Sequence, residues 1–191
     1  MKKFFSVFSF LAMTAIAAVS FVSCSDDNKE PEPKPQPTEN YARCRVLIEE
    51  AIFEYIDFTF TIEHDGTIDT YKMDETTKIS DTKLDDFAPF FDRKVSGRLF
   101  DKVFKYETLP VKYSAKYEFT EEGKKKIAAA ADGDVIMFYG AADLYKSDKD
   151  GKMISHDYHS LSGIKDCPVK DLEEGLADYA KMYPQLFSRS F

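Results

Sequence analysis

Alternating apolar and polar residues dominate the sequence from Tyr41 onward. Over residues 55–63 the two kinds separate onto two faces, with Ile56, Phe58, Phe60 and Ile62 on one face and Asp57, Thr59, Thr61 and Glu63 on the other. A period of two with a single apolar face predicts a strand that is half-buried in a sheet. Residues 111–120 alternate in the same way and predict another half-buried strand.

Turn sequences predict how the strands connect. An Asp-Gly pair within residues 64–67 separates the first strand from a β-prone run at 68–73, and glycine adopts the positive φ that a tight hairpin requires. Residues 134–146 are apolar enough for a central strand. The turn sequence at 148–151 is predicted to lead from it into a further strand at 152–158.

Three segments have weaker periodicity. Residues 43–54 begin as a β-prone segment and end in a helix-compatible tail, and residues 84–106 are predicted to be a loop followed by an irregular strand. The basic run at 123–126 is interpreted as a solvated loop or a helix start rather than a binding site.

The C-terminus has helical spacing instead. Apolar residues recur there at intervals of one helical turn: Leu172, Leu176, Tyr179, Ala180 and Tyr183. Asp171 and Glu174 are spaced for a capping box, and Pro184 is expected to end the helix. Several short strands followed by one late helix predict a mainly β fold, an antiparallel β-sandwich with one C-terminal α-helix.

The N-terminus has the pattern of an export signal. Lys2 and Lys3 precede residues 4–22, which contain no charged side chain. A permanent membrane span of about 20 residues is the alternative interpretation. The sequence of residues 21–24 resembles the lipobox of bacterial lipoproteins, in which the cysteine is acylated. We therefore predict a signal peptide at residues 1–23 and lipidation of Cys24.

Residues 24–40 are predicted to be the lipidated cysteine and a disordered acidic, Pro-rich linker. Residues 25–40 contain no large apolar side chain, and four prolines alternate with other residues between Pro31 and Pro37. Asp26 and Asp27 resemble the export tag of Bacteroidetes surface lipoproteins. We expect an outer-membrane lipoprotein that faces the cell surface, with the periplasmic face as the alternative, and a single domain at 41–191.

The composition excludes one class of partner and supplies no catalytic motif. The chain has 26 Lys and Arg against 34 Asp and Glu, a net charge of −8, so a nucleic acid is not an expected partner. The sequence contains no serine elbow, phosphate loop, dinucleotide fingerprint or HExxH motif. We therefore predict no cofactor, no metal site and no catalytic residue.

Two pairs of side chains each have a structural and a chemical interpretation. Cys44 and Cys167 remain once Cys24 is lipidated, and they either form a disulfide, as exported proteins often do, or stay separate as buried thiols. His156 and His159 suggest a metal site at first sight. Residues three apart in a strand point to opposite faces, so a solvated hairpin edge is the preferred interpretation.

One stretch of sequence resembles a known group of proteins. The order of lipobox, acidic linker, short strand, EYIDFTFTIEHDG and TLPVKYSAKYEFT resembles small Bacteroidetes surface lipoproteins that have an immunoglobulin-like sandwich and no established activity. The matching positions are Glu54, Tyr55, Asp57, Phe58, Thr59, Phe60, Thr61, Asp65 and Gly66. The resemblance implies an immunoglobulin-like β-sandwich and supplies no mechanism.

These observations predict a binding protein rather than an enzyme. We expect a membrane-anchored, non-enzymatic binding or envelope interaction module, held by its N-terminal lipid, with an unknown protein or glycan ligand. An accessory glycan-binding protein of a polysaccharide-utilisation system is the alternative, and it predicts an exposed cluster of two or three Tyr or Phe. A hydrolase, the third hypothesis, predicts a cleft with convergent carboxylates or a Ser/His pair.

Overall fold

The computed structural model describes residues 39–83, 94–154 and 161–191, and all of them belong to one compact unit. The predicted signal peptide at 1–23, the lipidation site Cys24 and nearly all of the predicted linker lie outside the described residues. His156 and His159 lie outside them too, as does the first part of segment 84–106. What the sequence predicts for these residues remains a prediction.

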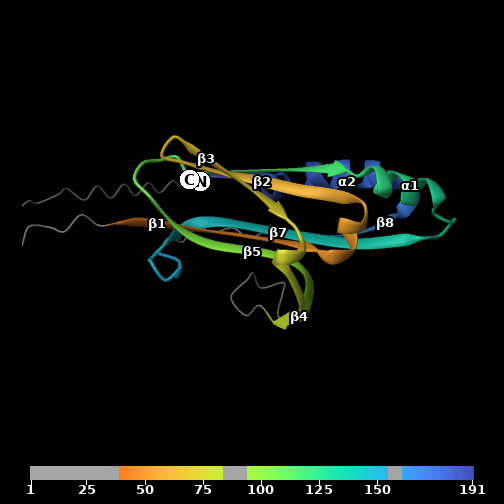
Figure 1. Ribbon diagram of the computed structural model, residues 1–191, viewed down its shortest axis with the longest axis horizontal. Helices are drawn as coiled ribbons and strands as arrows, with labels where there is room; N and C mark the ends of the chain where they lie inside the picture. The colour runs from red at the N-terminus through yellow and green to blue at the C-terminus, as the bar shows by residue number, and fades with distance from the viewer. Residues whose placement is uncertain (1–38, 84–93, 155–160) are drawn as a thin grey trace, which may run out of the picture. The chain divides into compact units, whose positions relative to one another are not determined.

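Two antiparallel sheets pack face to face as a sandwich (Figure 1). The strands are β1 (Asn40–Glu49), β2 (Ile56–His64), β3 (Thr67–Met73), β4 (Lys78–Lys83), β5 (Lys94–Tyr106), β6 (Lys112–Phe119), β7 (Val135–Ser147), β8 (Leu161–Pro168) and β9 (Ser188–Ser190). The larger sheet has the order β4-β5-β1-β7-β8, and the smaller sheet has the order β3-β2-β6-β9. The predicted mainly β sandwich is confirmed.

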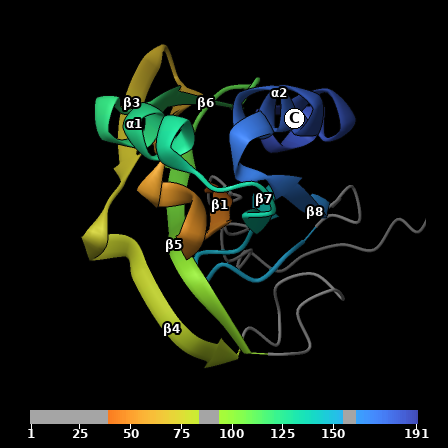
Figure 2. The same ribbon diagram turned by 90° about the vertical axis from the view of Figure 1, so that its right-hand side faces the viewer.

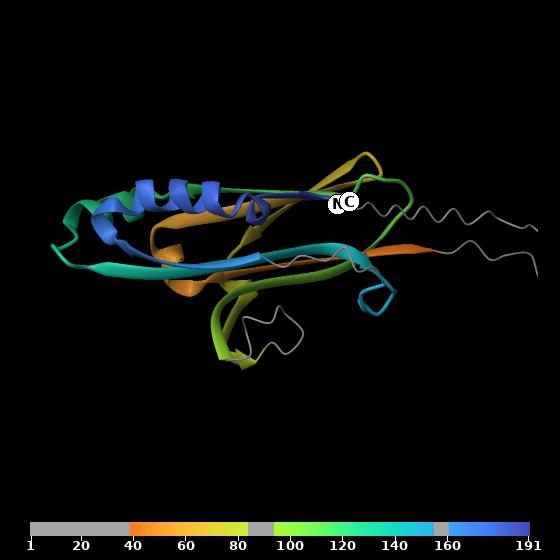
Figure 3. The same ribbon diagram turned by 180° about the vertical axis from the view of Figure 1, so that it is seen from behind.

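Helices cover one side and one end of the sandwich (Figure 3). The α-helices within the described residues are α1 (Glu121–Ala129) and the C-terminal α2 (Leu172–Met182). Short 3₁₀-helices connect the other elements: η1 (Glu50–Glu54), η2 (Glu75–Thr77), η3 (Val169–Asp171) and η4 (Pro184–Leu186). α2 ends before Pro184, as the sequence predicts.

Most strands form where the periodicity predicts them. β2 and β3 pair across the Asp-Gly turn, where Asp65 and Gly66 have positive φ angles of 50° and 74°. β6 and the interior strand β7 also occupy predicted segments. Residues 43–54 form most of β1 followed by η1, which matches the predicted change from β-prone to helix-compatible sequence.

The expectation of a single helix was wrong. The strand expected in the second part of segment 84–106 does form as β5, but it is regular and not irregular. α1 forms because the Thr120 hydroxyl accepts a hydrogen bond from the Gly123 amide (2.9 Å) and so caps a helix with two acids in its first turn. β5 is a regular strand over residues 97–106, where it pairs with β1 without interruption. Apolar residues on both faces of β5 hide its period of two.

The strand predicted at 152–158 lies largely outside the described residues, which stop at residue 154 before the gap at 155–160. Within the described part, Met153 forms an isolated bridge with Ser147. The predicted capping box was wrong. Asp171 precedes α2 without a side-chain capping hydrogen bond, so the expected capping box with Glu174 is not made. The preceding turn of 3₁₀-helix, η3, already leads the backbone into α2.

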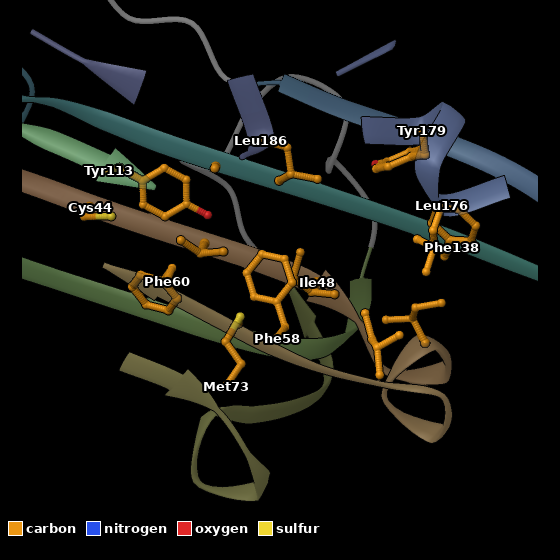
Figure 4. Packing of buried hydrophobic residues seen from close by; sticks show 14 of the residues in the cluster. Cys44, Ile48, Phe58, Phe60, Met73, Tyr113, Phe138, Leu176, Tyr179 and Leu186 are labelled. Atoms are coloured by element: carbon orange, nitrogen blue, oxygen red, sulfur yellow. The ribbon is translucent and has the colours of Figure 1, made fainter. Parts of the chain in front are cut away.

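Aromatic side chains from both sheets meet in the core (Figure 4). The ring of Phe60 on β2 has its centroid 4.8 Å from that of Phe100 and 5.7 Å from that of Tyr113. Toward α2, the ring of Tyr179 lies 4.8 Å from that of Phe138 on β7. Burying one such ring contributes about 1.5–3 kcal/mol, so these contacts hold the two sheets and α2 together.

A buried ion pair joins the central strands of the larger sheet. Arg45 of β1 lies opposite Asp143 of β7, and its Nη2 donates to Asp143 Oδ2 at 2.9 Å. Their exposed fractions are 2% and 1%. The neighbours Cys44 and Val46 belong to the core between the sheets, so Arg45 points to the other face. β1 is therefore buried on both faces.

The strand registers define two ends of the sandwich. At the near end, Asn40 pairs with Tyr106 and Tyr41 pairs with Ser147, which places the start of β1 beside the ends of β5 and β7. At the far end lie η1, α1 and η3, which Figure 2 shows from outside. There the Val169 amide donates to the Asp134 carbonyl oxygen at 2.9 Å.

Replacing Arg45 with Met should destabilise the fold by about 3–5 kcal/mol, because Asp143 then stays buried without its arginine. The double variant Arg45→Met/Asp143→Leu should recover most of this loss, since well-packed apolar residues replace the pair. Urea unfolding followed by circular dichroism measures both free energies. A single variant as stable as the wild type would contradict this account of the ion pair.

Candidate functional site

Cys44 and Cys167 are separate buried thiols, and neither forms a disulfide. Cys44 lies in the core on β1, and Cys167 lies on β8 with Sγ 3.3 Å from the Pro168 carbonyl oxygen. Burial raises the pKa of the Cys44 thiol, and the Asp143 carboxylate raises it further. Burial also raises the pKa of Cys167. Because the thiolate is the reactive form, neither position favours nucleophilic chemistry.

Asp65 connects the near-end hairpin to the chain between β5 and β6. Its Oδ1 accepts hydrogen bonds from the amides of Thr108 (2.7 Å) and Glu107 (2.9 Å) and from the Thr108 hydroxyl (3.1 Å). These donors, the Thr108 amide above all, lower the pKa of Asp65 to about 2. His64 lies on the other side, with Nδ1 3.2 Å from Asp65 Oδ2.

Polar contacts continue from His64 toward β5. His64 Nε2 lies 3.9 Å from Asp69 Oδ2, and the Tyr71 hydroxyl donates to the same oxygen at 3.2 Å. Lys102 donates to the Tyr71 hydroxyl at 2.6 Å. A hydrolytic relay would need a nucleophile within hydrogen-bond reach of the imidazole. Here both imidazole nitrogens face carboxylates, so the cluster ties β2, β3 and β5 together instead.

An open groove lies at the far end between η1, α1 and the start of β7. This end groove has a volume of about 460 Å³, and its lining residues are Tyr55, Lys126, Ala129, Ala130, Asp134, Val135 and Val169. Lys126 pairs with Glu54 at 3.1 Å, and Asp134 Oδ2 accepts from the Ala131 amide at 2.8 Å. The half-buried ring of Tyr55 and the opposite charges of Lys126 and Asp134 suit a polar ligand.

A second groove runs between β8 and α2. This α2 groove has a volume of about 220 Å³, and its acidic lining residues are Asp166, Asp171, Glu174 and Asp178. Lys165 and Gly175 also line it, and Lys165 Nζ donates to the Gly175 carbonyl oxygen at 3.2 Å. Glycosidases use a pair of carboxylates, so a hydrolase activity of this chain would be sought in the α2 groove.

Aromatic rings do not form an exposed platform in the part of the chain that the structure describes, where every Tyr and Phe is buried or half-buried. A small apolar cavity of about 20 Å³ lies between β6 and α2, and the half-buried Tyr117 and Phe187 are among its lining residues. The exposed cluster that the glycan-binding alternative predicts is therefore not found among these residues. Tyr55 is the ring that lines the end groove.

Metal ligands are not gathered anywhere in residues 39–83, 94–154 and 161–191: no group of three or more His, Cys, Asp or Glu side chains there is arranged to hold an ion. The acidic turn after β7 illustrates why. Asp148 Oδ1 accepts hydrogen bonds from the amides of Asp150 (3.0 Å) and Lys152 (2.8 Å), so its carboxylate shapes the turn.

The periodicity of the sequence could not predict which of these groups lie close together in the fold. The end groove joins Tyr55 to Val169, and the donors to Asp65 lie 42 and 43 residues along the chain. One signal was available, because Thr120 followed by two glutamates is typical of a helix start. That signal predicts α1, whose C-terminal end lines the end groove.

Comparison with protein-family models, curated proteins and solved structures finds no match to this chain. The resemblance to Bacteroidetes surface lipoproteins thus depends on the sequence motifs alone. Because no relative supplies a function, the function must be inferred from the geometry of the domain and from its predicted anchor.

The Asp65→Asn variant should lose stability at neutral pH and little at pH 2. The folded state lowers the pKa of Asp65 from 3.8 to about 2, so the carboxylate stabilises the fold fully above pH 4 and progressively less as the pH falls to 2. Asparagine tolerates the positive φ, so the change tests the charge. Thermal unfolding of both proteins between pH 2 and 7 measures the difference.

Asp81→Asn is the matched control for this experiment. Asp81 has a similar φ of 49°, but its carboxylate accepts a hydrogen bond from one exposed amine, that of Lys94. We expect a smaller loss of stability at neutral pH for this variant. A difference between wild type and Asp65→Asn that stays constant from pH 7 to 2 would contradict the assigned role of Asp65.

Proposed function

We propose that this protein is an exported lipoprotein, anchored through Cys24, whose β-sandwich is a non-enzymatic binding or envelope interaction module. The separation of its two ends carries the proposal. The predicted linker joins the domain at Asn40 at the near end, whereas the end groove opens at the far end. A tether at the near end leaves the far end free to meet a partner.

The strand order supports an immunoglobulin-like arrangement. In immunoglobulin domains one sheet has the order A-B-E-D and the other contains C, F and G, with C′ beside C in variable-type domains. If β1 to β6 are strands B, C, C′, D, E and F, then β4-β5-β1 has the order D-E-B and β3-β2-β6 has the order C′-C-F. β7 then takes the position of strand A beside β1, and β9 that of strand G beside β6.

The predicted lipid on Cys24 indicates where in the cell envelope the protein is located. Each buried methylene contributes about 0.8 kcal/mol, and one acyl chain alone anchors only reversibly, so several chains on Cys24 would hold the protein firmly. No helix of the described residues is long and apolar enough to cross a bilayer. Asp26 and Asp27 support display on the cell surface of the outer membrane, with the periplasmic face as the alternative.

Replacing Cys24 with Ala should release the protein from the envelope fraction, because no acyl chain can then be attached. Fractionation with high-salt and carbonate washes measures this release, and mass spectrometry of the wild-type protein should find the lipid on Cys24. The Cys44→Ala variant is the control and should stay in the envelope. A Cys24→Ala protein that resists both washes would refute the anchor.

A glycan array with the detergent-purified protein separates the main proposal from the glycan-binding alternative. We expect no saturable binding to any sugar, because the described residues contain no exposed aromatic platform. Binding that falls at least about tenfold in Tyr55→Ala but not in Tyr41→Ala would instead establish a glycan site in the end groove. Tyr41 is a half-buried tyrosine at the opposite end.

A further inference from the structure

The near end of the sandwich exposes apolar side chains on three separate segments. Six large apolar side chains are exposed in the described residues, and three of them lie at this end: Ile68, Leu109 and Ile154, with exposed fractions of 64%, 54% and 66%. Figure 1 and Figure 3 show the segments that carry them at the same end, namely the β2–β3 hairpin, the connection from β5 to β6 and the turn after β7. One exposed apolar residue is ordinary, but one on each of three neighbouring segments makes a candidate contact surface.

Hydrogen bonds hold the backbone beside each of these side chains. Ile68 is the second residue of β3, which pairs with β2 along its whole length. Leu109 follows Thr108, whose amide donates to Asp65 Oδ1 at 2.7 Å. The Ile154 amide donates to a backbone carbonyl oxygen of β7 at 3.1 Å. The three side chains are therefore presented by ordered backbone, so a contact made through them costs little further ordering.

Ion pairs offset much of the charge around this surface. Lys105 pairs with Glu39 at 2.9 Å, and Lys112 pairs with Glu63 at 3.2 Å. The turn at 148–152 contains two acids and two lysines. The whole chain has a net charge of −8, and a strongly acidic face would be repelled by anionic lipid. A face with balanced charges and exposed apolar side chains is suited to a lipid surface instead.

The predicted linker brings a lipid surface within reach of the near end. β1 begins at Asn40, beside the ends of β5 and β7. Residues 25–39 lie between Asn40 and the predicted lipid on Cys24, and fully extended at about 3.1 Å per residue they span roughly 50 Å. A short tether gives the domain a roughly millimolar effective concentration at its anchor, so even a weak contact with the bilayer can form.

We propose that the near-end surface, formed by Ile68, Leu109 and Ile154, rests on the bilayer that holds the predicted lipid. The three side chains enter the membrane interface, and the end groove then faces away from the membrane toward a partner. Without the lipid these side chains bind too weakly to hold the protein, because even one acyl chain anchors only reversibly. The docked orientation deepens the proposed interaction module and rests on that proposal.

The chain contains no tryptophan, so a single introduced tryptophan reports on its own surroundings. The lipidated Leu109→Trp protein, reconstituted in phosphatidylcholine vesicles, should lose at least about half of its fluorescence when the lipids carry brominated acyl chains. Val135→Trp is the matched control, because Val135 is 60% exposed and lines the end groove at the far end. We expect no quenching there. Equal quenching of the two variants, or none in Leu109→Trp, would overturn the proposal.

Paired substitutions test whether the other two side chains take part. In the Leu109→Trp protein, Ile68→Ser and Ile154→Ser together should reduce the quenching at least about twofold, because two inserted side chains lose their apolar surface. The control pair, Val135→Ser and Met137→Ser, removes two exposed apolar side chains of β7 and should leave the quenching unchanged. Equal effects of the two pairs would overturn the near-end surface.

Flotation of the same vesicles separates this proposal from the anchor. A protein that floats with the vesicles but shows no quenching at residue 109 keeps the anchor and refutes the docked orientation. A protein that does not float refutes the anchor, and the docked orientation with it. The Cys24→Ala variant should neither float nor be quenched, and quenching without the lipid would overturn the dependence on the tether.

Discussion

The ion pair between Arg45 and Asp143 joins two strands whose residues are 98 positions apart in the chain. Burying two charges costs several kcal/mol of hydration, so the pair adds little net stability. Its main effect is on register. A shift of β7 by one residue against β1 would turn Asp143 toward the core beside Cys44 and Val46, where a carboxylate cannot stay charged without a partner. Only the observed register pairs the two charges. This register also sets the positions of the elements that come after β7 in the chain.

The placement of β7 beside β1 determines how the sandwich is closed. The chain must return from the far end after β8, and it does so as α2, which packs on β8 at Gly175. A Cβ on Gly175 would lie 2.3 Å from Cys167 Sγ, so this close approach requires glycine. Because a helix occupies this side, β9 pairs with β6 over three residues only. The end groove and the α2 groove, each lined by a residue of η3, follow from the same placement.

The sequence predicted most accurately the strands that have one solvent-exposed face and one buried face. β2 and β6 alternate cleanly because their outer residues, such as Thr59 and Lys116, meet solvent. β1 and β5 carry apolar residues on both faces, so their period of two is obscured and β5 was misjudged. The candidate sites could not be predicted, because the end groove depends on how α1 and η3 meet. The contact between α1 and η3 is determined by the pairing of strands that are distant in the sequence and not by any local sequence pattern.

The distribution of polar groups restricts where a partner can bind. On the outer face of the smaller sheet, exposed ion pairs such as Lys72–Asp57 and Lys112–Glu63 satisfy each other, and one large apolar side chain, Ile68 opposite Glu63, is exposed there. On the outer face of the larger sheet, Leu47 and Tyr139 are buried, and so is Arg45 with its aspartate. Binding energy is usually concentrated in a few residues, often aromatic ones, that lie in a pocket. Among the described residues, the end groove has such a ring, that of Tyr55, with the charged side chains of Lys126 and Asp134 beside it.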